Sequence, residues 1–203
     1  AGWDKGFFLA SPDGNFRLQV KGQIQFRYVL NIRSSPIDVT PDSPNTTTQG
    51  FEMRRVKLKF LGNIVDRSWT YKVQGNFSAD LDDSGAFELE DAYIQKDFDN
   101  GLYIRGGQYK VPFTREELVS STKQLMVERS LLNAEFGAAR GLGVEAGWQG
   151  DWLRGMIQYN NGQKNINQGW ENNTTDFGFA GRGEFKIAGE WGQFDDLTSW
   201  NGD

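Results

Sequence analysis

Apolar and polar residues alternate along two long segments of the chain. From Phe16 to Arg33 every even position is apolar or glycine, and every odd position except Val29 is polar or charged. A second run over residues 69–81 alternates without exception. A period of two indicates β-strands with one apolar and one polar face. A soluble sandwich gives this pattern in shorter strands, whereas long aromatic-rich strands are typical of a membrane β-barrel.

The same pattern predicts eight strands. They lie at roughly 16–33, 51–65, 69–81, 87–98, 102–111, 140–149, 152–160 and 177–187. Tight turns and long polar loops mostly alternate between them, as in outer-membrane barrels of bacteria. The predicted turns are 66–68, 99–101 and 150–151, and the predicted loops are 34–50, 82–86, 112–139 and 161–175. In the second strand the apolar phase shifts at Arg54-Arg55, which predicts a β-bulge.

The segment 112–139 differs from the rest because its apolar residues have helical spacing. Thr114 and Glu117 have the spacing of a capping box, which marks the start of a helix. The apolar residues that follow are Leu118, Leu125, Met126, Leu132 and Phe136. Long loops with structure of their own are usually functional. We therefore expect a helical loop that folds back into the barrel and narrows it.

The composition excludes several classes of function. The 203 residues include no cysteine, so there is no disulfide scaffold and no thiolate metal site. They include no histidine, which removes the commonest general base and the commonest metal ligand. The sequence has no apolar run of 18 residues and thus no candidate transmembrane helix. We expect neither an enzyme nor a cofactor.

Basic residues concentrate on the polar face of the first strands. The net charge of −5 disfavours nucleic acid as a partner, yet residues 16–78 hold ten Lys/Arg against four Asp/Glu. The predicted anion pathway consists of Arg17, Lys21, Arg27, Arg55, Lys57, Lys59 and Lys72. No carboxylate in the same phase is expected before Asp80, and such rows of cations select anions in pores. Alternatively, these cations are the polar half of amphipathic strands, balanced by acids elsewhere.

Charged residues of the loop 112–139 leave two interpretations open. Lys123 and Arg129 are candidate constriction cations, partly neutralised by nearby glutamates that include Glu128. Alternatively, Glu128-Arg129 only pins the loop to the barrel wall by ion pairing. The orientation of Arg105, Lys110 and Arg140 stays open, because their strands alternate weakly. The acidic cluster 80–83 is interpreted as a solvated turn rather than a calcium site.

Several motifs in order along the chain resemble the phosphate-selective porin family of Gram-negative outer membranes. They are FEMRRVKLKF at 51–60, LEDAYI at 89–94 and GGQYKVPF at 106–113, then Glu117-Leu118, Ser120-Ser121 and Glu128-Arg129. The resemblance implies an all-β, antiparallel, 16-stranded transmembrane barrel, usually a homotrimer, whose third loop forms the constriction. Eight strands are half of that number. We therefore expect residues 1–203 to be one porin domain that continues beyond this sequence, with 112–139 as its constriction loop.

These observations predict a porin that passively conducts small anions, phosphate or related oxyanions, across the lipid of a bacterial outer membrane. A weakly selective general porin is the alternative within the same class. A barrel enzyme would need an unusual base in place of histidine. A soluble β-protein that binds acidic glycans would be extracted without detergent and would lack heat-modifiable gel mobility, whereas a barrel shows the opposite behaviour.

Replacing Lys57, Lys59 and Lys123 together by glutamate tests the predicted pathway. We expect anion preference to fall or invert, because three cations of the path become carboxylates. The reversal potential of the purified variant in a planar bilayer measures this change. An unchanged selectivity would contradict the prediction.

Overall fold

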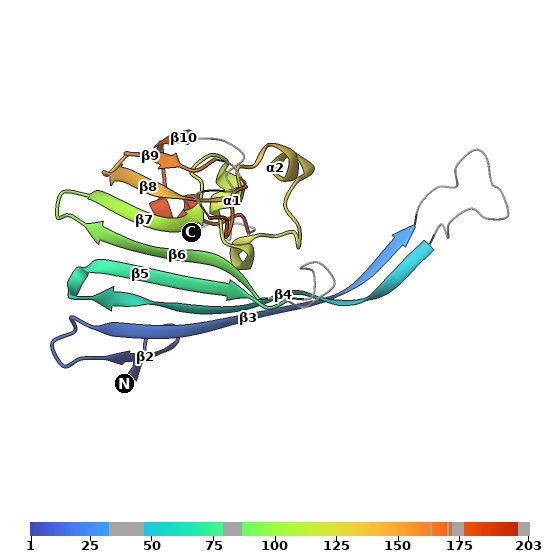
Figure 1. The fold of residues 1–203 in the computed structure, drawn as a ribbon, viewed down its shortest axis with the longest axis horizontal. Coiled ribbons are helices and arrows are strands. Elements are labelled where there is room, and N and C mark those ends of the chain that lie inside the picture. The colour runs from blue at the N-terminus through green and yellow to red at the C-terminus, as the bar shows by residue number, and fades with distance from the viewer. Residues whose placement is uncertain (33–46, 79–86, 163, 170, 172–176, 199–203) are drawn as a thin grey trace.

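The computed structural model of the protein describes residues 1–32, 47–78, 87–162, 164–169, 171 and 177–198 (Figure 1). The predicted loop 82–86 and the acidic cluster 80–83 lie outside these residues. So do most of the predicted loop 34–50 and part of the predicted loop 161–175.

In the described residues, ten antiparallel strands form one sheet, in which each strand pairs with its neighbours in sequence (Figure 1). The strands are β1 Gly2–Trp3, β2 Phe7–Ala10, β3 Arg17–Ile32, β4 Thr47–Ile64, β5 Asp66–Asn76, β6 Glu88–Asp97, β7 Leu102–Lys110, β8 Arg140–Gln149, β9 Leu153–Asn160 and β10 Gly178–Phe185. The eight predicted strands correspond to β3–β10, with ends that differ by up to five residues. The prediction of eight strands was two short, because β1 and β2 are too short to show a period.

The β3–β4 hairpin is much longer than the rest of the sheet and projects beyond it (Figure 1). Its register shifts between Gln25 and Phe26, so that Arg54 is the extra residue of the predicted bulge. The turn between β4 and β5 lies at Val65 (φ 68°), not at the predicted 66–68. Asp66 instead starts β5 and accepts a hydrogen bond from the backbone N–H of Ser68 at 2.7 Å.

The two faces of the sheet have opposite character, with the apolar one turned outwards. Each strand from β3 to β10 exposes at least one large apolar side chain, with 40% to 75% of its surface accessible. Examples are Ile24, Phe51, Val73, Ile94, Ile104, Val144, Ile157 and Phe179. Among the described residues, fifteen polar or charged side chains are buried but only five apolar ones, Pro112 included. This distribution is the reverse of a soluble domain and suits a sheet that meets lipid on its outer face.

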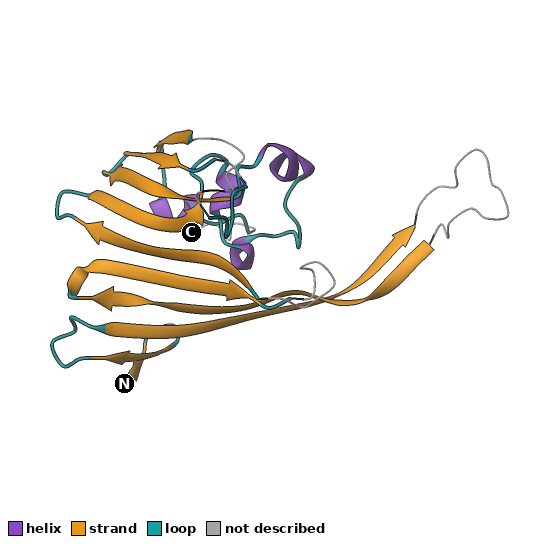
Figure 2. Ribbon diagram, in the orientation of Figure 1, coloured by secondary structure: helices purple, strands orange, loops and turns teal. Residues whose placement is uncertain are grey.

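Tight turns lie at one end of the sheet, and the loop 112–139 and its helices lie at the other (Figure 2). This loop, the inward loop below, contacts the polar face, where the Gln23 side-chain amide donates to Ser121 Oγ at 3.1 Å. The predicted single helix is instead three short turns, because Val119 and Gln124 are extended. They are α1 Arg115–Leu118, η1 Ser121–Lys123 and α2 Leu131–Phe136.

Another short helix, α3 Trp191–Phe194, follows β10. None of the helices in the described ranges is long and apolar enough to cross a membrane.

Lysine substitutions at two depths of β9 test whether the apolar face meets lipid. Ile157 lies within the strand and is 60% exposed, whereas Leu153 is its first residue at the turn end. Ile157→Lys is expected to cost about 2–4 kcal/mol of unfolding free energy and Leu153→Lys about 0–1 kcal/mol. Denaturant titration in lipid vesicles measures both. Small losses at both positions would contradict a lipid-facing sheet.

Candidate functional site

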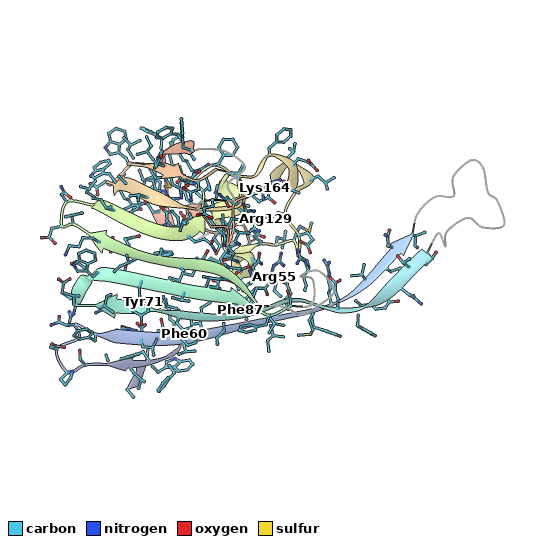
Figure 3. The ribbon with its side chains drawn as sticks, in the orientation of Figure 1. Arg55, Phe60, Tyr71, Phe87, Arg129 and Lys164 are labelled. Atoms are coloured by element: carbon cyan, nitrogen blue, oxygen red, sulfur yellow. The ribbon has the colours of Figure 1, made fainter. Side chains whose placement is uncertain are left out.

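A cavity of about 420 Å³ lies between the sheet and the inward loop. Its charged lining comprises Arg54, Arg55, Lys57, Lys59, Lys72, Lys110, Arg129, Arg140, Glu88, Glu90 and Asp91. Eight cations therefore face three carboxylates, and we call this space the cation cavity. Figure 3 shows Arg55 on the sheet and Arg129 on the inward loop at the same end of the sheet.

Two β-bulges bring charged side chains to the cation cavity in adjacent pairs. On β4 the bulge at Arg54 lets both Arg54 and Arg55 reach the inward loop. On β6 the register shifts between Gln74 and Gly75 of the partner strand, which leaves Glu90 as the extra residue. A bulge redirects side chains that strict alternation would place on opposite faces. As a result, Glu90 and Asp91 both line the cavity.

Carboxylates of β6 neutralise part of the predicted row of cations. Lys57 Nζ contacts Glu90 Oε1 at 2.5 Å, and Lys72 Nζ contacts Asp91 Oδ2 at 2.6 Å. Arg140 reaches both carboxylates, at 3.4 Å from Glu90 and 2.7 Å from Asp91. The expectation that no carboxylate joins the basic face before Asp80 was wrong for Glu52, because the bulge returns it to that face, where it pairs with Arg27. The acids of β6 come later in the chain but lie beside the cations in space.

Lys59 and Lys21 are different, because neither makes a hydrogen bond or ion pair with any described residue. They are directly opposite each other on β4 and β3, and Lys59 also faces Gln74 of β5. Like charges in this arrangement destabilise a strand pair. Lys59 lines the cation cavity, while Lys21 lies next to it in the register. Within the described residues, the charges of these two lysines are thus not neutralised by a direct contact.

Arg17 and Arg27 belong to the predicted pathway but do not line the cation cavity. Near the turn end, Arg17 Nη2 contacts Asp4 Oδ2 at 2.8 Å, and its guanidinium lies over the Phe8 ring. On the hairpin, Arg27 pairs with Glu52 and Glu128. The seven predicted cations therefore extend along the polar face, and only part of the row converges on one site.

Glu128 connects the inward loop to strands β3 and β4. Its carboxylate accepts hydrogen bonds from Arg27 Nη1 at 2.6 Å and from Arg54 Nη2 at 2.9 Å, and Arg55 Nη2 lies 3.5 Å away. Arg55 also donates to the backbone oxygen of Val127 at 2.9 Å. The hydrogen bond from Arg54 is the main reason that the pKa of Glu128 lies below its ordinary value. This geometry fits the pinning interpretation for Glu128 alone, because Arg129 contacts residues of the inward loop itself.

Lys110 and Arg129 hold the end of α1. Lys110 Nζ donates to the backbone oxygens of Glu117 at 2.5 Å and Val119 at 3.1 Å, and Arg129 Nε donates to that of Glu116 at 3.0 Å. These cations satisfy carbonyls that a helix end leaves unpaired. Their charges still line the cation cavity.

Thr114 caps α1 as predicted, by accepting a hydrogen bond from the Glu117 N–H at 3.4 Å. The reciprocal half of the predicted capping box is wrong. The Glu117 carboxylate instead accepts from Asn133 Nδ2 at 2.9 Å and lies 3.5 Å from Arg129. This buried contact ties α1 to α2.

The other predicted constriction cation, Lys123, is exposed and does not line the cation cavity. Within the described ranges, no group of three or more Asp or Glu residues is placed to hold a metal ion.

A family model of phosphate-selective porins O and P matches residues 26–197, nearly the whole chain. The chain belongs to this family. The match confirms the resemblance found in the sequence, and it places the protein among outer-membrane channels rather than in an enzyme family. A comparison with curated proteins finds no match.

Several residues of this porin's cation cavity were missed or left open by the sequence. Arg54 was not assigned a role, although the phase shift marks the bulge that directs it. Lys110 and Arg140 line the cavity, whereas Arg105 packs against the rings of Tyr93, Tyr103 and Tyr109, with Nη1 3.6 Å from Glu145. The bulge at Glu90 could have been predicted from the spacing of apolar residues. Leu89 and Ala92 both face outwards but are three residues apart, whereas alternation requires two.

Removing the Glu128 carboxylate should release the inward loop of the porin. Glu128→Gln is expected to make the open-channel current noisier at pH 7, because three arginines of the sheet lose their charged contact with the inward loop. In the native protein the carboxylate tether is complete above the ordinary glutamate pKa. It is lost only as the pH falls through the lowered pKa. Current noise recorded from pH 7 to pH 3 measures both effects.

Glu135→Gln is the matched control, because Glu135 is an exposed glutamate of α2 without a hydrogen bond or ion pair to any described residue. Equal noise in the two variants at pH 7 would rule out Glu128 as the tether.

Proposed function

We propose that this porin conducts small oxyanions, with phosphate as the favoured one, through a narrow point formed by the sheet and the inward loop. The observation that supports this proposal is the cation cavity, where eight basic side chains face three carboxylates. The inward loop lies over the polar face and brings Arg129 close to the basic residues of β4 and β5, and Lys110 at the end of β7 lines the same cavity. The phosphate-selective family gives the expected anion.

The chemistry of the lining suits an oxyanion that must both enter and leave. Clustered cations with low-dielectric walls raise the local concentration of anions. Guanidinium groups offer a fork that matches two phosphate oxygens, whereas a lysine acts as a movable point charge. Conduction requires binding that is weak enough for release. Glu90 and Asp91 meet this need, because they limit the excess of positive charge next to the path.

The proposed pathway divides the basic residues of the polar face and the inward loop into three groups. Lys59 and Lys21 are without ion pairs to the described residues and are the groups that we expect to meet the anion. Lys57, Lys72 and Arg140 hold the β6 carboxylates, and Arg27, Arg54 and Arg55 hold Glu128. These paired cations shape the wall and set its potential. Lys123 and Arg17 contribute to the field at a distance from the cavity.

We also propose that the open sheet is part of the wall of a closed barrel in an outer membrane. The exposed apolar face supports this, since lipid would cover it, and strands β5 to β9 pair on both sides over most of their length. We retain one porin domain over 1–203, with 112–139 as its constriction loop, and a homotrimer as proposals. A soluble glycan-binding protein would have to leave this apolar face in water.

A weakly selective general porin is the second candidate. The three carboxylates in the cavity favour it, because Glu88, Glu90 and Asp91 offset part of the charge that attracts anions. A general porin would pass chloride without inhibition by phosphate. Inhibition therefore separates the two candidates.

Phosphate inhibition of chloride current, measured with and without Lys59, tests the proposed pathway. The triple substitution of Lys57, Lys59 and Lys123 is less informative, since glutamate at 57 would lie against Glu90. We expect phosphate to inhibit the native channel and Lys59→Gln to weaken the inhibition, because an unpaired cation is lost from the path. Lys96→Gln is the control, since Lys96 Nζ contacts Ser68 Oγ and does not line the cavity. Equal inhibition in both variants would contradict the role of Lys59.

A further inference from the structure

Residues 186–198, which follow β10, form a second segment that reaches the inward loop. We call this segment the strap. It starts at the turn end of the sheet, where Phe185 pairs with Leu153 and the Lys186 N–H donates to the Trp152 oxygen at 2.7 Å. From there it runs through α3 to residues 123–125 of the inward loop (Figure 1). The strap thus connects the end with the tight turns to a loop that belongs to the other end.

The first half of the strap is fixed to the sheet. Trp191 Nε1 donates to the Gly150 oxygen at 2.9 Å, and the Arg154 guanidinium lies 4.7 Å from the centre of the Trp191 ring. Arg154 Nη2 also contacts Asp195 Oδ1 at 2.9 Å. A charged hydrogen bond and a cation–π contact on one arginine restrict the position of α3.

The second half of the strap is fixed to the inward loop by backbone hydrogen bonds. The Leu197 N–H donates to the Lys123 oxygen at 2.8 Å, and the Leu125 N–H donates to the Leu197 oxygen at 3.3 Å. Leu197 and Gln124 thereby form a parallel β-bridge. The loop residues Ser120 and Ser121, which line the cation cavity, come just before this bridge.

Arg115 adds a second connection between the two segments. Its guanidinium donates to three backbone oxygens of the strap, those of Phe194 at 2.8 Å, Asp196 at 3.2 Å and Gln193 at 3.3 Å. These carbonyls lie at the C-terminal end of α3, where no intrahelical donor is available. One side chain of α1 therefore holds the end of α3.

We propose that the strap positions the inward loop and that Arg115 is the positioning residue of this contact. The inward loop is then held from two sides, by Glu128 on the β3–β4 wall and by the strap at residues 115 and 123–125. The width of the narrow point depends on both attachments. This inference rests on the proposed function in one respect, because it takes the inward loop as the narrow point of the channel. It does not depend on which ion passes.

A disulfide between Gln124→Cys and Leu197→Cys tests the contact directly. Bridged residues of adjacent strands lie about 4.8 Å apart, a separation that suits a disulfide, and the sequence holds no other cysteine. We expect oxidation of the membrane-embedded protein to join the pair, detected by mass spectrometry of its peptides. Gln124→Cys with Gly192→Cys is the matched control. The added Cβ at 192 meets no atom within 4 Å, and this pair should stay unjoined.

Arg115→Ala in the 124/197 cysteine background tests the effect on the pore. We expect the reduced protein to have a higher and noisier open-channel conductance, and oxidation to restore the native level reversibly. The 124/192 background should show no redox dependence. The proposal would be overturned if the 124/197 pair failed to join. It would also be overturned if neither Arg115→Ala nor the disulfide changed the conductance. A native channel without anion selectivity would count against the proposed function and not against the strap.

Discussion

The structure depends on one constraint, which is that its sheet faces lipid. Such a sheet must satisfy its backbone hydrogen bonds within itself, and it must place apolar and polar side chains on opposite faces by alternation. The meander of ten strands meets the first requirement over most of β5 to β9, which pair on both sides, whereas the projecting part of the β3–β4 hairpin is paired on one side only. Alternation meets the second by placing large apolar side chains outside and polar ones inside. The inner face then carries many charges in a confined space. Their mutual arrangement, rather than an apolar core, determines the interior.

On the inner face, carboxylates neutralise part of the positive charge. The acids Glu90 and Asp91 each hold two cations, and Glu128 gathers three arginines, so most of the basic groups have a fixed place. Fixed cations define the shape of the cation cavity, and the pairing leaves Lys59 and Lys21 without a described partner. In our proposal the same ion pairs thus hold the inward loop and limit how tightly an anion is bound. The proposal thus assigns stability and conduction to the same residues.

The strands could be predicted well from the sequence, because apolar and polar residues alternate over many positions in β3 and β5. A period of two over such a length indicates a β-strand and no other regular structure. The sequence also predicted the bulge at Arg54 from a shift of phase. It did not predict that β6 would supply the partners of Lys57 and Lys72, because pairs that form across strands depend on register. The inward loop was located but not its shape, since three short turns held by Lys110, Arg129 and Arg115 depend on contacts distant in sequence. The strap left no periodic signal.

The most direct test of the account is the reversal potential of the native protein in a planar bilayer under a potassium chloride gradient. An excess of cations along the inner face predicts a potential of the sign that chloride permeation gives. A potential near zero, or one of the opposite sign, would show that the basic lining does not control which ions pass. The central claim would then be wrong, and a weakly selective porin would be the better description.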